Sequence, residues 1–197
     1  MLRRAIDILV SAGALLVSCP LLGAAALAIR LESPGPVLYR QRRAGLRGRP
    51  FELLKLRTMV SGAERIGAGL AINENDPRIT RVGALLRRTS LDELPNLVNV
   101  LRGDMSLIGP RPTLPAQVEQ YTERQRGRLS IKPGITGWAQ VNGRASLPWP
   151  ERIELDLYYI EHRSLLLDLE ILRRSVALVL GGSGVYKGHT GGWEGPM

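Results

Sequence analysis

The sequence contains few of the residues that define several protein classes. Aromatic residues make up 5% of the 197 positions, with one Phe, whereas proteins that stack on single-stranded bases need aromatic faces. Nucleic acid is therefore not the expected partner. One cysteine, Cys19, rules out an internal disulfide, and two histidines give no Cys/His cluster for structural zinc. The glycine patterns of Walker A loops and dinucleotide-binding folds are also missing.

Length and charge restrict the organisation of the chain. A chain of 197 residues predicts one domain with at most an appendage. Residues 1–60 hold ten Lys or Arg against three acids, and the remaining 137 residues hold seventeen against fifteen. This basic N-terminal third attracts phosphate as nucleic acid, anionic membrane lipid or nucleotide, and charge alone does not choose among them.

A long apolar run follows the basic start. Residues Ile8 to Ile29 carry no charge, and a helix of this length is sufficient to cross a hydrocarbon core of about 30 Å. Basic residues flank it on both sides: Arg3 and Arg4 before it, and Arg30, Arg40, Arg42, Arg43, Arg47 and Arg49 after it. The positive-inside rule then places the downstream domain in the cytoplasm and permits both ends of the run on that side.

Proline interrupts this run. Pro20 removes a helical hydrogen bond and biases Cys19 away from helical dihedrals, which favours a re-entrant helix-break-helix. Ser18 is our hypothesis for the group that satisfies the freed backbone. A straight span fits the residues equally well. Signal-peptide cleavage after Ala24 to Ala28 is disfavoured, because it would release a basic domain without disulfides.

The remaining segments predict a helix-rich α+β fold. Alternation over Val37–Arg42 and Phe51–Arg57 predicts a β-hairpin. Its basic residues are expected mostly on one face: Arg40, Arg42, Lys55 and Arg57. A short helix or an extended segment is expected at 82–88 and a loop at 60–80. Amphipathic helices are expected at 151–163 and 168–180, and such helices suit a core or a membrane interface. We expect a membrane segment at 1–33, a catalytic domain at 34–180 and a Gly-rich tail at 181–197.

The densest group of charged residues is Arg87-Arg88-Thr89-Ser90-Leu91-Asp92-Glu93. Ser90 and Glu93 match a capping box, but Pro95 favours Asp92 as the cap of a helix from about Glu93 to Leu101, closed by Gly103. A helix N-terminus keeps a carboxylate ionised. Asp92 would then face a phosphate as nucleophile or Mg²⁺ ligand. Capping and catalysis remain compatible alternatives.

Two further segments suit phosphate or nucleotide. Arg111 lies between two prolines that fix its backbone, which suits bidentate phosphate binding or a surface turn. Residues 132–144 include Gln140 and Asn142 and predict a nucleotide-binding loop or a strand with an Asn-Gly turn.

Taken together, the motifs resemble the bacterial sugar transferase family, the monotopic polyprenyl-phosphate phosphoglycosyltransferases. The segments that carry the resemblance are Arg4–Asp7 with Pro20 in the apolar run, Leu54–Met59, Thr89–Pro95, Leu101–Pro112 and Lys132–Gly143. They cover nearly the whole chain in order. The chain looks like the small catalytic-core form, without the added membrane helices of larger members.

The resemblance implies a re-entrant helix and a catalytic domain on the cytoplasmic face of the bacterial inner membrane. It also implies Mg²⁺-dependent transfer of a sugar phosphate from a UDP-sugar to undecaprenyl phosphate, with UMP released. Asp92 matches the family nucleophile that forms a phosphosugar-aspartyl intermediate, and Glu93 matches the second essential carboxylate. The family's phosphate and substrate positions correspond to Arg87, Arg111, Lys55 and Arg57, with Gln140 and Asn142 as substrate candidates. Cys19 departs from the Ser that often precedes the family's proline.

Two alternatives remain open at this stage. One is direct displacement through a ternary complex, without a covalent intermediate. The other is a non-enzymatic basic membrane anchor that recruits nucleic acid or proteins, and it predicts salt-sensitive binding. The sequence does not indicate which sugar is transferred.

Overall fold

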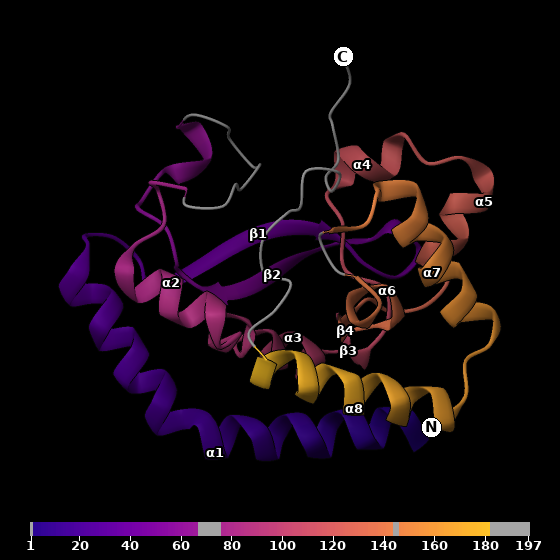
Figure 1. The fold of residues 1–197 in the computed structure, drawn as a ribbon, viewed down its shortest axis with the longest axis horizontal. Helices are drawn as coiled ribbons and strands as arrows, with labels where there is room; N and C mark the ends of the chain where they lie inside the picture. Colours follow the sequence, from indigo (N-terminus) through magenta and orange to yellow (C-terminus); the bar gives the residue numbers. More distant parts are fainter. Residues whose placement is uncertain (1, 67–75, 144–145, 182–197) are drawn as a thin grey trace.

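The computed structural model describes residues 2–66, 76–143 and 146–181, and it confirms a helix-rich α+β chain (Figure 1). The helices are α1 (Leu2–Glu32), α2 (Arg81–Arg88), α3 (Asn96–Arg102), α4 (Pro115–Glu119), α5 (Glu123–Arg126), α6 (Trp138–Val141), α7 (Trp149–Glu161) and α8 (Leu165–Gly181). The strands are β1 (Leu38–Ala44), β2 (Pro50–Leu56), β3 (Ser106–Ile108) and β4 (Gly134–Thr136), and the short 3₁₀ turns are η1 (Leu46–Gly48), η2 (Ala63–Arg65), η3 (Leu91–Glu93) and η4 (Gly127–Leu129).

Strands β1 and β2 form the predicted antiparallel hairpin, but its basic residues divide between two faces. Tyr39 pairs with Lys55, and Arg40 pairs with Leu54. Directly opposed residues point to the same face and successive residues to opposite faces. Lys55 therefore lies on the face opposite Arg40 and Arg42, and the expected single basic face is wrong.

Helix α3 and a parallel pair of strands pack beside the hairpin. Leu53 of β2 packs with Val100 of α3 and Met105, all of them buried. Strands β3 and β4 are parallel, and β3 contributes Ile108 to a second cluster with Tyr159 of α7 and Ile171 of α8. The domain is thus built from small adjoining cores rather than from one large sheet.

The N-terminal end of α1 is joined to this domain by charged side chains. Asp7 is buried and accepts hydrogen bonds from Ser106 Oγ at 2.8 Å and from the backbone N–H of Leu107 at 3.0 Å. Arg4 donates to the Val100 and Leu101 carbonyls near the C-terminal end of α3. These contacts satisfy both the carboxylate and exposed helix carbonyls.

The C-terminal end of α1 is joined to the same domain. Buried Arg57, just after β2, donates to the carbonyls of Ser33 at 2.8 Å and of Pro34. Glu32 accepts from the backbone N–H groups of Arg81 and Val82 at 2.7 and 3.0 Å, where α2 begins. Both ends of α1 are therefore fixed to one polar domain.

Between these two attachments, α1 is apolar and largely uncovered. It is the one helix in the described part of the chain that is long and apolar enough to cross a membrane, and 11% of its most apolar window is buried. Leu16 and Val17 are 78% and 80% exposed. Such exposure is costly in water, which indicates an apolar environment around the middle of α1.

Helix α1 continues through Pro20 instead of being interrupted there. Figure 1 shows a bend partway along it, of the kind that proline causes. Ser18 Oγ donates to the Leu15 carbonyl at 3.4 Å. Pro20 has no backbone N–H, so the carbonyl that lacks its usual helical hydrogen bond is that of Leu16. Cys19 is exposed. The predicted break is thus a bend in a continuous helix, and the serine does not satisfy the freed carbonyl.

The remaining helix predictions are mostly confirmed. Helix α2 matches the expected 82–88 segment, and α7 buries Ile153 and Leu157 on one face as predicted. In the expected 60–80 loop the structure describes η2 and a bridge between Met59 and Ile79, while 67–75 lie outside the described residues. The expected tail also lies outside them, except for Gly181.

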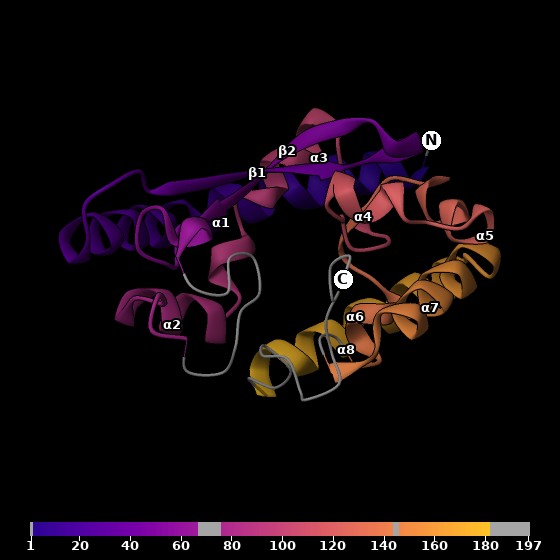
Figure 2. The ribbon, with the colours of Figure 1, turned by 90° about the horizontal axis from the view of Figure 1, so that it is seen from above.

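Helix α8 leaves its predicted apolar face uncovered. Its exposed apolar side chains are Leu165, Leu166, Leu169, Leu172, Val176 and Val179. The N-terminal ends of α1 and α8 are joined by an ion pair between Arg3 and Asp168 at 2.8 Å. Figure 1 shows the two helices along the lower side of the molecule, and Figure 2, seen from above, shows them diverging from their N-terminal ends.

Asn99 is the polar link between α3 and β2, and its loss should be costly. Its side chain is fully buried, donates to the Glu52 carbonyl at 2.6 Å and accepts from the Leu54 N–H at 3.1 Å. Asn99→Ala leaves both groups unpaired and should lower the free energy of unfolding by about 2–4 kcal/mol.

Asn96 supplies the matched control, because it is equally buried on the same helix but its Oδ1 has no hydrogen-bond partner. Chemical denaturation of both variants in detergent should show the smaller loss for Asn96→Ala. Equal losses would mean that side-chain volume, not the bridge to β2, is what Asn99 contributes.

Candidate active site

The Asp92–Glu93 pair lies in η3, between α2 and α3, and not at the start of a helix as predicted. Ser90 takes a left-handed conformation with φ of 56° and makes no side-chain cap, and α3 begins at Asn96. A left-handed residue turns the chain away from the preceding helix. Both capping hypotheses are therefore wrong, although Gly103 closes α3 as expected, with φ of 92°.

Glu93 is held between two cations. Its Oε1 accepts from Lys55 Nζ at 2.7 Å and from Arg111 Nη2 at 3.0 Å. Burial alone would raise the pKa of Glu93, but Lys55 and Arg111 together hold this pKa well below its usual range. Glu93 is therefore ionised and fixed by β2 on one side and by the loop after β3 on the other.

Asp92 occupies a different environment, since only 9% of it is exposed. Burial is the largest influence on its pKa, and the pKa is raised even though Lys55 and Arg87 act in the opposite direction. The neighbouring Glu93 charge adds to the rise. The expectation that a helix N-terminus keeps Asp92 ionised is thus corrected: the turn provides no such helix end.

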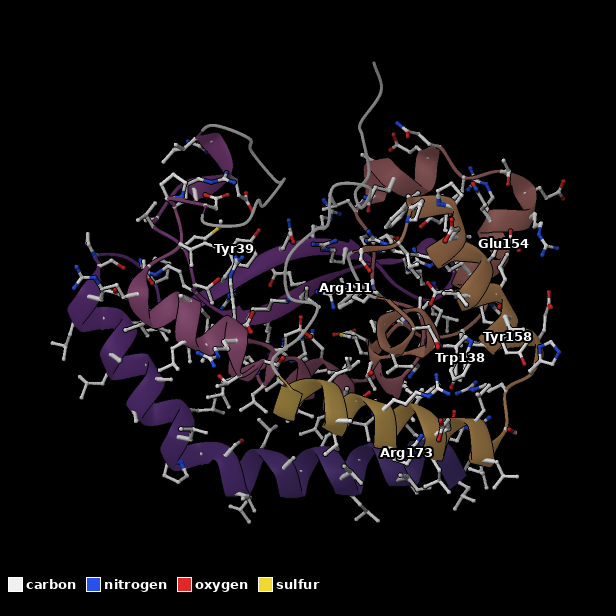
Figure 3. All side chains as sticks on the ribbon, in the orientation of Figure 1. Tyr39, Arg111, Trp138, Glu154, Tyr158 and Arg173 are labelled. Atoms are coloured by element: carbon white, nitrogen blue, oxygen red, sulfur yellow. The ribbon has the colours of Figure 1, made fainter. Side chains whose placement is uncertain are left out.

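Two arginines, Arg87 and Arg111, complete the charged cluster around Asp92, Glu93 and Lys55. Arg87, at the end of α2, donates from Nε to Thr58 Oγ1 at 2.8 Å, and Arg111 is about half exposed, with 51% of its side chain accessible. Figure 3 shows Arg111 between the hairpin and the C-terminal helices. Three cations, Lys55, Arg87 and Arg111, thus surround two carboxylates, an arrangement with spare positive charge for a phosphate.

Other predicted site residues lie outside this cluster and serve the fold. Arg57 is occupied by carbonyls at the end of α1. The Asn142 amide donates to the Trp138 carbonyl and accepts from Arg174, both at 2.8 Å. Gln140 is buried in α6, and its Oε1 has no hydrogen-bond partner. Their predicted contacts with substrate remain predictions.

Arg128 was not predicted, and the structure places it directly behind Arg111. Its buried guanidinium donates to Asp156 at 2.6 Å, to the Tyr121 hydroxyl at 2.7 Å and to the Arg111 carbonyl at 3.0 Å. It thereby fixes the backbone that carries Arg111. Arg128 is one of three alternating arginines with Arg124 and Arg126, and no local pattern distinguishes the buried one.

Arg43 is a second residue that the sequence did not single out. It is half-buried on the hairpin and donates to the Pro112 carbonyl at 3.3 Å. Burial, followed by the positive charge of Arg111, lowers its pKa to about 10. Arg43 therefore adds to the positive field on the side of the site formed by the hairpin.

The donor set suits a magnesium ion that substrate phosphates help to bind. The described residues contain no group of three or more His, Cys, Asp or Glu placed to hold a metal. Mg²⁺ commonly uses one or two carboxylates with water and phosphate oxygens. Asp92 and Glu93 meet that smaller requirement, and both cations on Glu93 use the same oxygen.

The opposite pKa shifts predict opposite stability changes. Asp92→Asn removes a carboxyl whose ionisation is costly when buried, so it should raise the free energy of unfolding at pH 8 by about 1 kcal/mol. The gain should shrink as pH falls, because Asp92 then becomes protonated in the wild-type protein.

Glu93→Gln is the matched comparison. It removes a carboxylate that stabilises the fold above its unfolded-state pKa, so it should destabilise the protein at pH 8 by about 1–3 kcal/mol and by less below about pH 4.5. Thermal unfolding in detergent from pH 8 to pH 4 tests both. Destabilisation by Asp92→Asn at pH 8 would contradict the account of its burial.

Comparison with known proteins gives a consistent assignment. A family model described as bacterial sugar transferase matches residues 1–182. An uncharacterized sugar transferase of Bacillus subtilis, EpsL, is 47% identical over 157 residues, which cover 80% of this chain and 76% of that protein. The UDP-glucose:undecaprenyl-phosphate glucose-1-phosphate transferase of Caulobacter vibrioides is 47% identical over 186 residues, 90% of this chain and 69% of that protein.

The transferase of the same name from Escherichia coli is 46% identical over 180 residues, which cover 87% of this chain but 39% of that protein. The chain thus spans well under half the length of that relative. The five motifs that carry the resemblance, from Arg4 to Gly143, all lie within residues 1–182, which the family model matches. With the family model covering every described residue, the chain belongs to the bacterial sugar transferase family.

Proposed function

We propose that this protein transfers a sugar 1-phosphate from a UDP-sugar to undecaprenyl phosphate and releases UMP, as a membrane step of polysaccharide or glycoconjugate synthesis. Two relatives carry names that state this reaction for glucose. The observation that carries the proposal is the buried Asp92 beside an ionised Glu93 within three cations. Such a site suits two phosphates of a nucleotide-sugar.

In the proposed first step, a carboxylate oxygen of Asp92 attacks the β-phosphorus of the UDP-sugar. A new O–P bond forms to Asp92, the bond from this phosphorus to the bridging oxygen breaks, and UMP leaves with that electron pair. Arg87, Arg111 and Lys55 offset the negative charge that moves onto UMP. Loss of the Asp92 proton must precede attack, so the rate should rise with pH through its raised pKa.

In the second step, a phosphate oxygen of undecaprenyl phosphate attacks the same phosphorus and displaces Asp92, which restores the carboxylate. Glu93 contributes by fixing Lys55 and Arg111 at 2.7 and 3.0 Å. Arg128 contributes from behind by holding the Arg111 carbonyl. Fixed cations lower the barrier because they need no rearrangement as charge develops.

We also propose Mg²⁺ as the cofactor, held by Asp92 and Glu93 together with substrate phosphates. When bound, it would neutralise diphosphate charge. Arg87, Arg111 and Lys55 supply the remaining positive charge from the protein itself.

The attachment of α1 supports a monotopic location on the cytoplasmic face of the inner membrane. Arg4 and Asp7 hold one end of α1 against the domain, and Arg57 and Glu32 hold the other. A folded polar domain cannot lie on both sides of a bilayer, so a helix with both ends attached to it enters and returns. The exposed apolar face of α8 suits the adjoining interface.

The direct test incubates detergent-purified protein with Mg²⁺, undecaprenyl phosphate and a panel of UDP-sugars, and measures UMP. One sugar should yield UMP, and Asp92→Asn should reduce the rate by at least about 10³-fold, because the nucleophile is lost. Glu52→Gln is the control, since it removes a negative charge from the exposed part of β2. Full activity of Asp92→Asn would exclude the nucleophile assignment.

A second assay separates the covalent route from direct displacement. Labelled UMP should exchange into the UDP-sugar without any lipid acceptor, because only a covalent intermediate reverses with UMP alone. Product formation without exchange would favour the ternary complex. No activity with any sugar, together with salt-sensitive nucleic-acid binding, would favour the non-enzymatic anchor.

A further inference from the structure

A second cationic site lies at the N-terminal end of α1, and it shares no residue with the Asp92–Glu93 cluster. It is an open groove of about 690 Å³. Its lining residues are Leu2, Arg3, Arg4, Asp7, Ser106, Ser130, Ile131, Lys132, Arg163 and Leu165. Four of them are cationic, whereas the single carboxylate, Asp7, is already occupied by Ser106 and the Leu107 N–H.

Two carboxylates, Asp7 in the groove and Asp168 beside Arg3, offset two of these four positive charges, and the other two are not neutralised within the described residues. Arg3 is paired with Asp168, and Arg4 donates to the neutral carbonyls of α3. Within the described residues, Lys132 and Arg163 form no ion pair; the Arg163 side chain hydrogen-bonds to the neutral Tyr159 hydroxyl, and its Nε is buried without a hydrogen-bond partner. Like charges around one groove repel each other, and a bound anion would remove this repulsion.

The geometry brings two of the cations to one point. Lys132 Nζ and Arg4 Nη2 lie 3.4 and 3.5 Å from where a Cβ on Gly103 would be. Gly103, with φ of 92°, leaves that space without a side chain. The ammonium and guanidinium groups therefore lie near each other at this end of the groove, and Arg4 keeps its donations to the α3 carbonyls.

The rim of the groove is apolar, which favours a phosphate that carries apolar chains over a free phosphate ion. Leu2 is 62% exposed and Leu165 is 51% exposed, and the neighbouring Leu166 is 80% exposed. Leu2 begins α1, and Leu165 and Leu166 begin α8; Figure 2 shows the two helices diverging from these ends. A cationic groove beside exposed leucines suits a phosphate with attached acyl chains better than a phosphate free in water.

We propose that this groove binds the headgroup phosphate of an anionic membrane phospholipid, separately from the substrates of the active site. Lys132 and Arg163 supply the charge that the protein leaves unpaired, and Arg4 lies next to the bound phosphate. The leucines contact the acyl chains. The lipid would hold the corner between α1 and α8 at headgroup depth. This binding does not depend on the proposed transfer reaction.

The test measures retention of phosphatidylglycerol on the full-length, detergent-purified protein by native mass spectrometry, with phosphatidylcholine as the uncharged reference lipid. The wild-type protein should retain phosphatidylglycerol in preference to phosphatidylcholine. A Lys132→Gln/Arg163→Gln double variant should bind it at least about 10-fold more weakly, because each cation contributes to attraction of anionic headgroups.

The matched control is Arg40→Gln/Arg42→Gln, which removes the same charge from exposed hairpin positions and should retain the lipid as wild type does. Unchanged thermal unfolding of the double variant shows that it folds. Equal retention by both double variants, or displacement of the lipid by millimolar inorganic phosphate, would overturn the proposal. So would loss of undecaprenyl phosphate turnover with phosphatidylglycerol binding unchanged.

Discussion

The structure depends on one constraint: a long apolar helix must be attached to a basic polar domain at both of its ends. Charged side chains make these attachments by binding backbone groups or each other. Asp7 and Arg4 do so at the start of α1, and Arg57 and Glu32 do so at its end. Because these contacts are directional and partly buried, they fix the helix more specifically than apolar contact would.

This attachment also determines where the reactive groups lie. Strand β2 carries Lys55, which binds Glu93, and Arg57, which holds the end of α1, follows it two residues later. Glu32 then binds the start of α2, whose last turn supplies Arg87. The apolar helix and the carboxylate pair are thus connected through single elements, β2 on one side and α2 on the other.

Local periodicity predicted much of this architecture. Alternation predicted the β1–β2 hairpin, and the spacing of apolar residues predicted α7 and α8, since these patterns reflect one apolar face, which α7 buries and α8 leaves exposed. The start of α3 was mispredicted because Ser90 adopts a left-handed conformation that no helix rule anticipates. Arg57 was predicted to bind phosphate and Arg128 was not singled out, because the backbone carbonyls that they bind lie far along the chain. Long-range contacts of this kind leave no local pattern.

The most direct test of the attachment concerns the sidedness of α1. Leu2→Cys and Leu31→Cys, each in a Cys19→Ser background, place single thiols at exposed positions near its two ends. A membrane-impermeant maleimide should label neither thiol in intact cells and both after the inner membrane is permeabilised. Labelling of one end in intact cells, with the other protected, would show a helix that spans the bilayer and would contradict its attachment at both ends to one domain.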